Sequence, residues 1–410
     1  MHRDTITHCL STATDFVVTA SCDGHIKFWK KVENGIEFVK HFRSHLAPIK
    51  SLAANPEGTL LCSAAVDKSL KIFDIVNFDM INMMRLDYIP SCAEWVHGSG
   101  DAVHALAVAD ADTSRIHVYD GRGANVPLEV LEKMHSAPVS LIKYNNTFDV
   151  ALSFDGLHML EYWSGQRGGF ATPKCLAFKS KLDTDLFEFA KNKATISGLA
   201  FSPDGRKFAT TSSDRKVRVF HFLTGRLHRV LDETLPRFTE LQTAKQLLPN
   251  MEFGRRMAVE RDLEKSEQAT SSNVLFDASG HFLLYPTLLG VKLVNLHSNR
   301  LVRIVGKNEN LRLLNIALHQ GSGRRGKAAV TLEIEGSNNP TLEAIRPDPT
   351  LIATAYKKSR FYLFSSREPD DPQGHGQERD VFNEKPSKED TLAVSDTPAA
   401  QRLYENAIMH

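Results

Sequence analysis

Cysteine is scarce in this chain, and the few cysteines do not form a recognisable pattern. The 410 residues contain five, and no CxxC pair occurs. An odd count without such pairs argues against a disulfide framework and against a structural zinc site. Cys22 and Cys62 fall in small, apolar contexts typical of strands, so we expect buried free thiols there. A reducing compartment, cytosol or nucleus, fits this cysteine usage.

Long apolar runs and an excess of one charge are also missing. No stretch of about 18 apolar residues occurs, so the sequence predicts no transmembrane helix and no membrane partner. The N-terminus has no apolar signal core. The chain has 50 basic and 49 acidic residues, a balance that gives no general argument for binding nucleic acid. Its length exceeds one ordinary compact core and therefore implies several domains or a repeat.

A repeated unit is present instead. The stretch FSPDGRKFATTSSDRKVRVF (Phe201–Phe220) aligns without gaps with Asn55–Asp74 and with Arg346–Phe364. Thr14–Trp29 shares the same relative positions, and three weaker copies complete the set. Seven units, the first four spaced by 44 to 46 residues, predict an all-β fold, a seven-bladed β-propeller. The strand-end anchors of the units are Trp29, Phe73, Tyr119, Trp163, Phe220, Val294 and Phe364.

The clearest units have a turn, a small-residue strand, a second turn with Asp, and an alternating strand that ends in an aromatic residue, whereas the sixth and seventh units lack the turn Asp. An Asp in the second turn can accept hydrogen bonds from backbone N–H groups and from a histidine. His45 and His135 occupy that partner position, and Asn192 occupies it in the unit of Phe201. The positions expected to stabilise the blades are Asp23, Trp29, His45, Ser63, Asp67, Phe73, His135, Asp155, Trp163, Thr210, Asp214 and Phe220.

This pattern resembles the WD40 repeat. The resemblance implies a propeller over residues 1–366, with a helical insertion at about 231–272. The last unit, near 311–366, is expected to be incomplete, because only MHRD precedes the first strand. Residues 367–405 are polar and rich in proline, which predicts a disordered linker.

Two insertions interrupt the repeats. In residues 231–272 we predict two helices: a capping box from Thr239 to Gln242 begins the first, and Pro249 ends it. The second is expected from Met251. This pair either braces the propeller rim or docks a partner. In the other insertion, residues 164–191, we expect Phe187 and Phe189 to cover apolar surface.

We identify no enzyme motif in the sequence. Gly321–Ala329 matches GxGxxG and nearly matches a phosphate-binding loop, but Ala328 stands where that loop needs Ser or Thr. A strand pattern follows instead of a helix, so a solvated loop is favoured over a phosphate or RNA contact. The 17 histidines are scattered. We therefore assign no catalytic residue, metal or cofactor, and expect no direct RNA contact.

Several segments resemble one narrower family, the nuclear, spliceosome-associated cyclophilins with an N-terminal WD propeller. They include DGHIKFWKK, GIEFVKHFRSHL, VNFDMINMM, NMEFGRRMAVERDLEK and RDVFNEKPSKED. The resemblance implies a peptidylprolyl isomerase domain that would begin near residues 406–410, tethered by residues 367–405. The cyclophilin segment of the type FHRIxxxFxxQ does not occur in the 410 residues, so we expect no isomerase activity from this chain.

Two function classes remain open at this point. The resemblance implies a nuclear scaffold that recruits an isomerase to the spliceosome through protein partners. The alternative is a reader of histone tails, which should have an acidic, aromatic-rimmed channel mouth. Arg215 and Lys216, in the turn after Asp214, are the residues we select as possible partner contacts.

Overall fold

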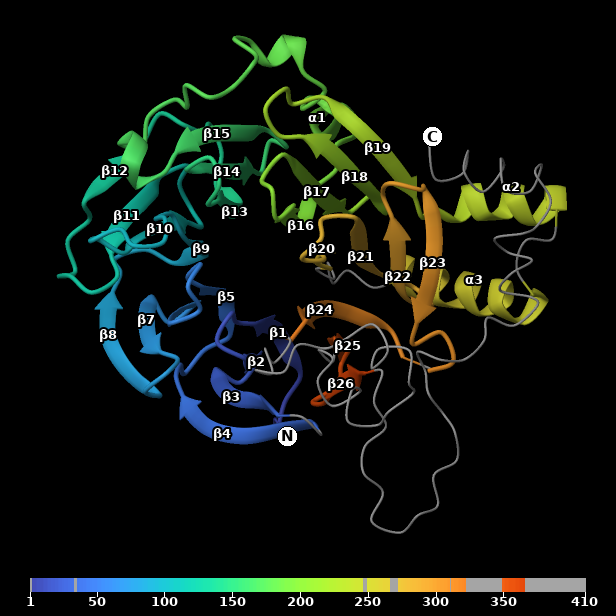
Figure 1. Ribbon diagram of the computed structural model, residues 1–410, viewed down its shortest axis with the longest axis horizontal. Coiled ribbons are helices and arrows are strands. Elements are labelled where there is room, and N and C mark those ends of the chain that lie inside the picture. The colour runs from blue at the N-terminus through green and yellow to red at the C-terminus, as the bar shows by residue number, and fades with distance from the viewer. Residues whose placement is uncertain are drawn as a thin grey trace, which may run out of the picture.

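The computed structural model describes residues 2–32, 35–245, 249–265, 272–309, 311–321 and 349–365; residues 244–245 and 264–265 are described by their backbone alone. Seven antiparallel sheets follow one another around a ring (Figure 1). The predicted seven-bladed propeller is therefore confirmed. No helix in the described ranges is long and apolar enough to cross a membrane.

The first four blades occupy the N-terminal half of the chain. Blade 1 contains β1 (Ile6–Ser11), β2 (Phe16–Ser21), β3 (His25–Val32) and β4 (Gly35–Arg43). Blade 2 contains β5 (Ile49–Ala54), β6 (Leu60–Ala65), β7 (Ser69–Asp74) and β8 (Asp79–Arg85). Blade 3 contains β9 (Pro90–Trp95), β10 (Ala105–Asp110), β11 (Ile116–Asp120) and β12 (Glu129–Leu131). Blade 4 contains β13 (Val139–Asn145), β14 (Val150–Asp155) and β15 (Leu160–Ser164).

The remaining blades are interrupted by the insertions. Blade 5 contains β16 (Ile196–Phe201), β17 (Lys207–Ser212), β18 (Lys216–His221) and β19 (Leu227–Asp232). Blade 6 contains β20 (Leu275–Phe276), β21 (Phe282–Thr287), β22 (Gly290–Asn295) and β23 (Arg300–Val305). Blade 7 contains β24 (Leu313–His319), β25 (Thr350–Ala355) and β26 (Phe361–Phe364). The helical elements are η1 (Gln166–Gly168), η2 (Lys181–Asp183), α1 (Glu188–Asn192), α2 (Leu235–Lys245) and α3 (Asn250–Lys265).

The composition of each strand matches its place in the blade. All residues of β6, LLCSAA, are buried, because neighbouring blades cover both faces of a second strand and small side chains fit there. All seven strand-end anchors lie on the third strand of their blades, and Phe73, Trp163 and Phe220 are buried. Cys62 is buried and Cys22 half-buried, and both are free thiols.

Polar side chains connect the innermost strands around the ring. Ser51 in β5 accepts a hydrogen bond from the backbone N–H of Ala93 in β9 (3.1 Å). Asn273, just before β20, donates to the carbonyl of Ile316 in β24 (2.6 Å) and accepts from the N–H of the same residue (2.8 Å). Asn315 in β24 donates to the carbonyl of Thr7 in β1 (2.6 Å), which joins the last blade to the first. These bonds fix the blades relative to one another.

The first turn of the repeat also bridges two blades. Gly205 has a φ of +68°, and its carbonyl accepts a hydrogen bond from the Asn145 side chain of blade 4 (2.9 Å). A Cβ atom on Gly205 would lie 2.7 Å from Asn145 and Thr147. Gly58 is equivalent in blade 2, and Thr14 of blade 1 donates to its carbonyl (2.8 Å). Glycine is therefore required for two reasons: the backbone has a positive φ, and there is no room for a Cβ atom.

The ring closes by packing blade 7 against blade 1. The rings of Trp29 and Phe361 lie 5.1 Å apart, and His319 is 2.9 Å from the carboxylate of Asp15. Within the described residues the sheets of blades 4 and 7 each have three strands, and the prediction of an incomplete last blade involves positions outside those residues. The segments predicted as a linker (367–405), as the start of a further domain (406–410) and as the glycine-rich loop (322–329) lie outside the described residues.

The insertion at 231–272 forms two helices beside blades 5 and 6 (Figure 1). The predicted capping box is wrong: α2 begins at Leu235, and Thr239 lies inside the helix, where its hydroxyl donates to the carbonyl of Leu235 (2.9 Å). Pro236 sits in the first turn, where the missing N–H costs no hydrogen bond, and this start signal was overlooked. In the other insertion Phe189 is buried against blade 4, whereas Phe187 is 37% exposed.

Candidate interaction site

Blade 4 contains a chain of hydrogen bonds among four side chains. His135 lies with Nδ1 3.1 Å from the Asp155 carboxylate and with Nε2 2.6 Å from the Ser153 hydroxyl. Trp163 donates from Nε1 to the same hydroxyl (3.0 Å). Burial lowers the pKa of His135 even though Asp155 raises it, so the ring is neutral at pH 7. In that state Nδ1–H donates to Asp155, and Nε2 accepts from Ser153.

Blade 2 has a shorter version of this chain. His45 lies 2.7 Å from the Ser63 hydroxyl and 3.1 Å from the Asp67 carboxylate. Phe73 has no donor, so the chain ends at Ser63. Burial lowers the pKa of His45, while hydrogen bonds from Ser69 and His45 hold the pKa of Asp67 below its usual range despite partial burial. These side chains form hydrogen bonds with one another, as residues with a structural role do.

Blade 1 supplies a histidine that the sequence reading overlooked. His2 Nε2 lies 2.7 Å from the Thr19 hydroxyl, and Trp29 donates to the same hydroxyl (2.9 Å). Asp23 turns back on its own loop and accepts from the N–H of His25 (3.3 Å). His2 lies so close to the first strand that its position does not look like part of a repeat. Only the spacing between this histidine and the hydroxyl-bearing residue of the same blade could have identified it.

Blade 5 pairs its turn aspartate with an arginine, whereas blades 2 and 4 use a histidine. Arg218 is fully buried, and its Nη2 lies 2.5 Å from the Asp214 carboxylate. Despite burial, the bonds from Arg218 and Ser212 keep the pKa of Asp214 low. Thr210 donates to the carbonyl of Arg218 (3.4 Å). Asn192 was wrongly placed as the partner of Asp214: it lies at the end of α1, and its amide donates to Glu188 (2.6 Å).

A second buried charge cluster holds the helical insertion on the propeller. Glu233 receives the Lys292 ammonium (2.6 Å), the Tyr285 hydroxyl (3.0 Å) and, on its other oxygen, the Arg256 guanidinium (3.4 Å). Burial alone would raise the pKa of Glu233, but the two cations and the hydrogen bonds hold it below its ordinary range. The Arg256 guanidinium also stacks on Phe238 of α2 (3.6 Å to the ring centroid). One carboxylate therefore connects blade 6 to α3.

Sequence reasoning missed this cluster, although one signal was available. Lys292 lies two residues before the anchor Val294, just as Arg218 lies two residues before Phe220. A charge at that strand position requires a covering partner. In blade 4 the same position holds Glu161, which pairs with Lys181 of the insertion at 164–191.

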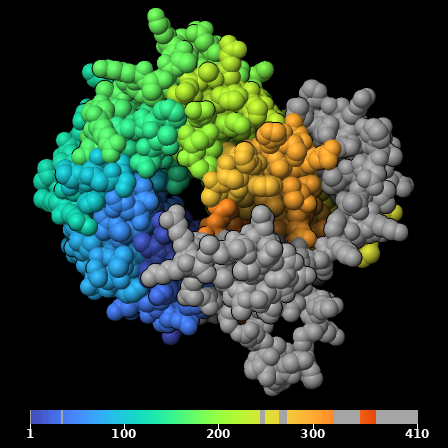
Figure 2. Space-filling model, in the orientation of Figure 1, coloured from blue at the N-terminus to red at the C-terminus, as the bar shows by residue number. Residues whose placement is uncertain are grey.

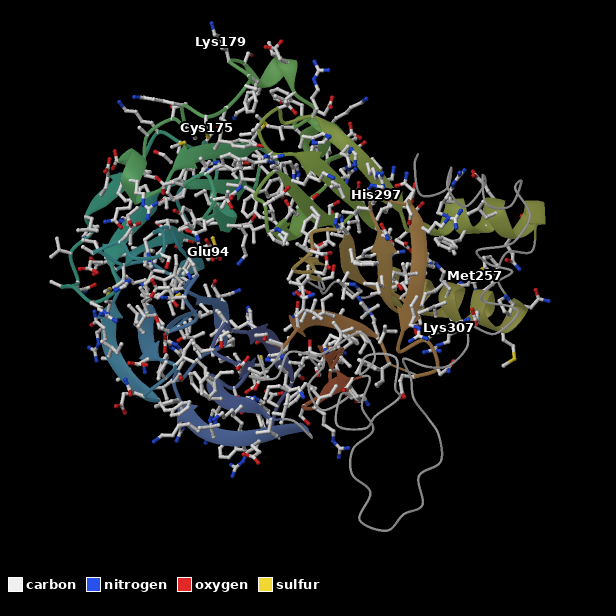
Figure 3. The ribbon with its side chains drawn as sticks, in the orientation of Figure 1. Glu94, Cys175, Lys179, Met257, His297 and Lys307 are labelled. Atoms are coloured by element: carbon white, nitrogen blue, oxygen red, sulfur yellow. The ribbon has the colours of Figure 1, made fainter. Side chains whose placement is uncertain are left out.

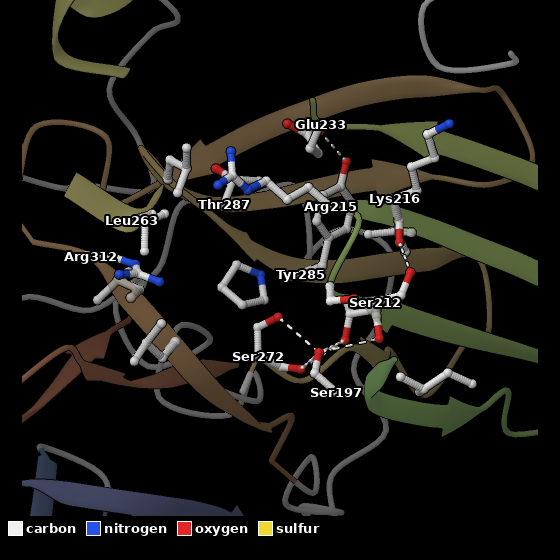
Figure 4. Close-up of a pocket in the computed structure, with 18 of the residues that line it drawn as sticks. Ser197, Ser212, Arg215, Lys216, Glu233, Leu263, Ser272, Tyr285, Thr287 and Arg312 are labelled. Carbon is white, nitrogen blue, oxygen red and sulfur yellow. Dashed lines mark hydrogen bonds between the residues drawn. The ribbon is translucent and has the colours of Figure 1, made fainter. Parts of the chain in front are cut away.

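A cavity of about 500 Å³ lies where α3 approaches blades 5, 6 and 7. Figure 4 shows Arg215, Leu263 and Arg312 along one side of it and Ser197, Ser212 and Ser272 along another. Its volume falls in the range of ligand-binding clefts. The charged residues that line it are Arg215, Lys216, Glu233, Arg256 and Arg312.

The two residues selected as partner contacts both lie at this cavity. Arg215 has a φ of +60°, and its guanidinium forms an ion pair with Glu260 of α3. Lys216 is about one-third exposed, with Nζ 3.8 Å from the Asp232 carboxylate. Arg215 therefore helps to hold the insertion, whereas Lys216 remains accessible beside it.

The central opening of the ring contains a separate ion pair. Figure 2 shows the hollow at the centre, and Figure 3 labels Glu94 beside it. Glu94 in β9 and Lys143 in β13 lie 2.5 Å apart. Burial raises the pKa of Glu94, and Lys143 opposes this shift. In the part of the chain that the structure describes, no group of three or more His, Cys, Asp and Glu side chains could hold a metal ion.

Comparison with known proteins agrees with this geometry. The family model for the WD domain, G-beta repeat, matches residues 1–30, 36–74 and 184–221, which fall in blades 1, 2 and 5 and in the segment before blade 5. A human protein, peptidylprolyl isomerase domain and WD repeat-containing protein 1, is 52% identical over 100% of this chain. This chain is a seven-bladed propeller that is similar, over its whole length, to a protein named for both an isomerase domain and WD repeats.

Other matches support this relationship and this fold. The Arabidopsis thaliana peptidyl-prolyl cis-trans isomerase CYP71 is 46% identical over 100% of the chain. The chain spans 64% of the length of the human relative and 66% of the plant relative. A solved structure, the Cps50 (Swd1) β-propeller domain of Myceliophteria thermophila, matches with a TM-score of 0.56. The match covers 88% of this chain and 96% of the chain of the solved structure. At 15% sequence identity, it shows similarity of fold alone.

Proposed function

We propose that this propeller is a protein-interaction scaffold that recruits a peptidylprolyl cis-trans isomerase to the spliceosome, in the nucleus. The observation that carries the proposal is the match, over the full 410 residues, to relatives named for both an isomerase domain and WD repeats. The shared part in this chain is the propeller, so its role is sought in binding rather than in catalysis.

The arrangement of side chains supports a binding role. The Asp, His and Ser side chains of blades 2 and 4 bond to one another inside the blades. They fix the fold, which leaves the loops and the insertion to contact partners. The helix α3 corresponds to NMEFGRRMAVERDLEK, a segment that generic WD repeats do not need. A helix that generic WD repeats do not need offers a surface for a partner that other WD propellers do not bind.

Affinity capture from nuclear extract tests the proposal. The tagged chain and an unrelated WD propeller of equal size are used as parallel baits, and bound proteins are quantified by mass spectrometry. We expect spliceosomal proteins to be enriched on this chain alone. Equal recovery on both baits would contradict the proposal, and recovery of histones without spliceosomal proteins would favour a histone-tail reader instead.

A further inference from the structure

We propose that the cavity between α3 and blades 5, 6 and 7 binds an anionic, partly apolar peptide segment of a protein partner. The inference rests on the proposed role as an interaction scaffold and names the surface that would perform it. Carboxylate and phosphate side chains share the required chemistry, and both are considered as sources of the negative charge.

The charges that line the cavity are mostly positive. Arg215, Lys216 and Arg312 come from blade 5 and from the segment before β24, and Arg256 comes from α3. Glu233 is the only carboxylate among the described lining residues. Two further carboxylates lie outside the lining. Glu260 forms an ion pair with Arg215, and Asp232 forms one with Lys216. Lys292 adds another cation behind Glu233, so the described lining presents mainly positive groups.

The arginines are held in positions that carry an electrostatic cost. Burial lowers the pKa of Arg312, and the positive charge of Arg215 lowers it further, although Tyr356 acts in the opposite direction. The Arg256 side chain is 2% exposed, and its Nε has no hydrogen-bond acceptor among the described residues. A bound anion would relieve both the like-charge contact and the unmatched donor.

The remaining lining indicates a peptide rather than a free ion. Ile196, Val217, Leu263, Pro286 and Leu313 contribute apolar surface beside the cations. The hydroxyls of Ser197 and Thr211 contact each other (3.1 Å), and both donate to the carbonyl of Ser272 (3.0 and 2.8 Å). A ligand with an anionic group next to an apolar side chain would match both parts of this wall.

RNA is a poorer match for the same surface. Nucleic-acid binding usually draws on an extended basic face, whereas this chain has a net charge of +1 and its described cavity has one compact group of cations. RNA is therefore treated as an outcome of the experiment.

Fluorescence anisotropy with defined probes tests the inference. Three labelled ten-residue peptides alternate leucine with phosphoserine, glutamate or serine, and a ten-nucleotide oligouridylate is the fourth probe. The variants are the double substitution Lys216→Glu with Arg312→Glu, and a control, Arg43→Glu with Arg122→Glu, at exposed sites in blades 1 and 3. Circular dichroism and melting temperature check that each variant is folded, and Arg312→Gln replaces the double variant if it is not.

We expect the phosphoserine peptide, the glutamate peptide or both to bind, and the serine peptide to bind at least about tenfold more weakly. The Lys216→Glu, Arg312→Glu variant should weaken binding of the anionic peptides by about tenfold or more, while the control stays within about twofold. Protection of residues 212–217 from hydrogen exchange by the peptide would locate the site. Absence of binding, equal binding by the cavity variant, or a preference for oligouridylate would overturn the inference. If the peptides bind while nuclear extract yields no spliceosomal proteins, only the spliceosomal assignment fails.

Discussion

At the residue scale, one hydroxyl decides how well a blade is held. Ser153 joins His135 to Trp163, so its loss leaves two buried polar groups without a partner. Ser63 has the same place in blade 2 but serves His45 alone, because Phe73 cannot donate. The two serines therefore form a matched pair for measuring the value of the tryptophan bond.

Ser153→Ala should destabilise the protein by about 1–3 kcal/mol, since unsatisfied buried groups cost more than the hydrogen bond itself contributes. Ser63→Ala should cost less, about 1 kcal/mol, because it leaves only His45 Nε2 without its partner. Thermal unfolding followed by circular dichroism compares the two variants with the parent. A larger loss for Ser63→Ala than for Ser153→Ala would show that the tryptophan bond does not matter.

Buried histidines should make stability depend on pH. Burial lowers the pKa of His2, His8 and His228 to about 4, and it lowers the pKa of His45 and His135 as well. The unfolded chain takes up protons near pH 6.5 and the folded chain does not, so stability is full above about 6.5 and falls as pH drops toward about 4. Asp67 and Asp214 have lowered pKa values, so their contribution is lost only below about 3.8.

We therefore expect the melting temperature to fall between pH 7.5 and pH 5, above the range in which Asp67 and Asp214 titrate. Melting curves at half-unit steps in constant ionic strength measure this. His135→Gln should flatten part of the slope if it folds. A melting temperature that stays constant over this range would mean that these histidines are protonated as easily in the folded chain as in the unfolded one.

At the scale of elements, a tight turn sets the spacing between blades 4 and 5. Gly205→Ala places a Cβ 2.7 Å from Asn145 and Thr147 at a φ of +68°. The strain and the overlap should cost at least about 2 kcal/mol. Gly100 is the control, because its φ is +80° but no atom lies within 4 Å of its Cβ position.

Gly100→Ala should cost about 1 kcal/mol, the conformational part alone. Chemical denaturation of both variants gives the difference. Equal losses would mean that the contact with blade 4 yields without cost, and that the glycine is needed for its conformation alone.

Glu233 is the buried carboxylate among the contacts that hold the insertion, beside the Arg215–Glu260 ion pair, so its removal should loosen the helix. Glu233→Gln leaves Lys292 and Arg256 buried without a counter-charge, and breaking such a cluster typically costs about 3–5 kcal/mol. We expect faster hydrogen exchange in α3 with little change in blades 1–3. Glu240→Gln is the control, because the Glu240 side chain is 68% exposed in its pair with Arg237 and should contribute about 0.5 kcal/mol at most. Unchanged exchange in α3 would show that other contacts hold the insertion.

At the scale of the whole molecule, much of the fold could be predicted because each repeat shows the same short sequence pattern of turns and strands. Phe201–Phe220 contains its own turn glycine, small strand and anchor, so a gapless match to Asn55–Asp74 indicates a blade. The partners of those residues were harder to predict. Asn192 had the correct spacing for a histidine substitute, yet the buried Arg218 on the strand itself meets Asp214.

The cavity could not be predicted at all, because it depends on distance in space rather than on spacing in sequence. Arg256, in a mixed-charge helix, reads as a solvated residue, but it is buried against Glu233 and Phe238. Only the ring brings α3 near Arg215 and Arg312. Arg215 was selected from a turn, and its pairing with Glu260 depends on that same approach.

Sedimentation through a glycerol gradient tests the recruiting role of the propeller most directly. Tagged chain is added to splicing-competent nuclear extract, and each fraction is probed for the chain and for spliceosomal small nuclear RNAs. We predict that a fraction of the chain moves with the spliceosomal complexes, and that excess untagged chain displaces it. A chain that stays in the light fractions, at the position it takes in buffer alone, would contradict the proposed function.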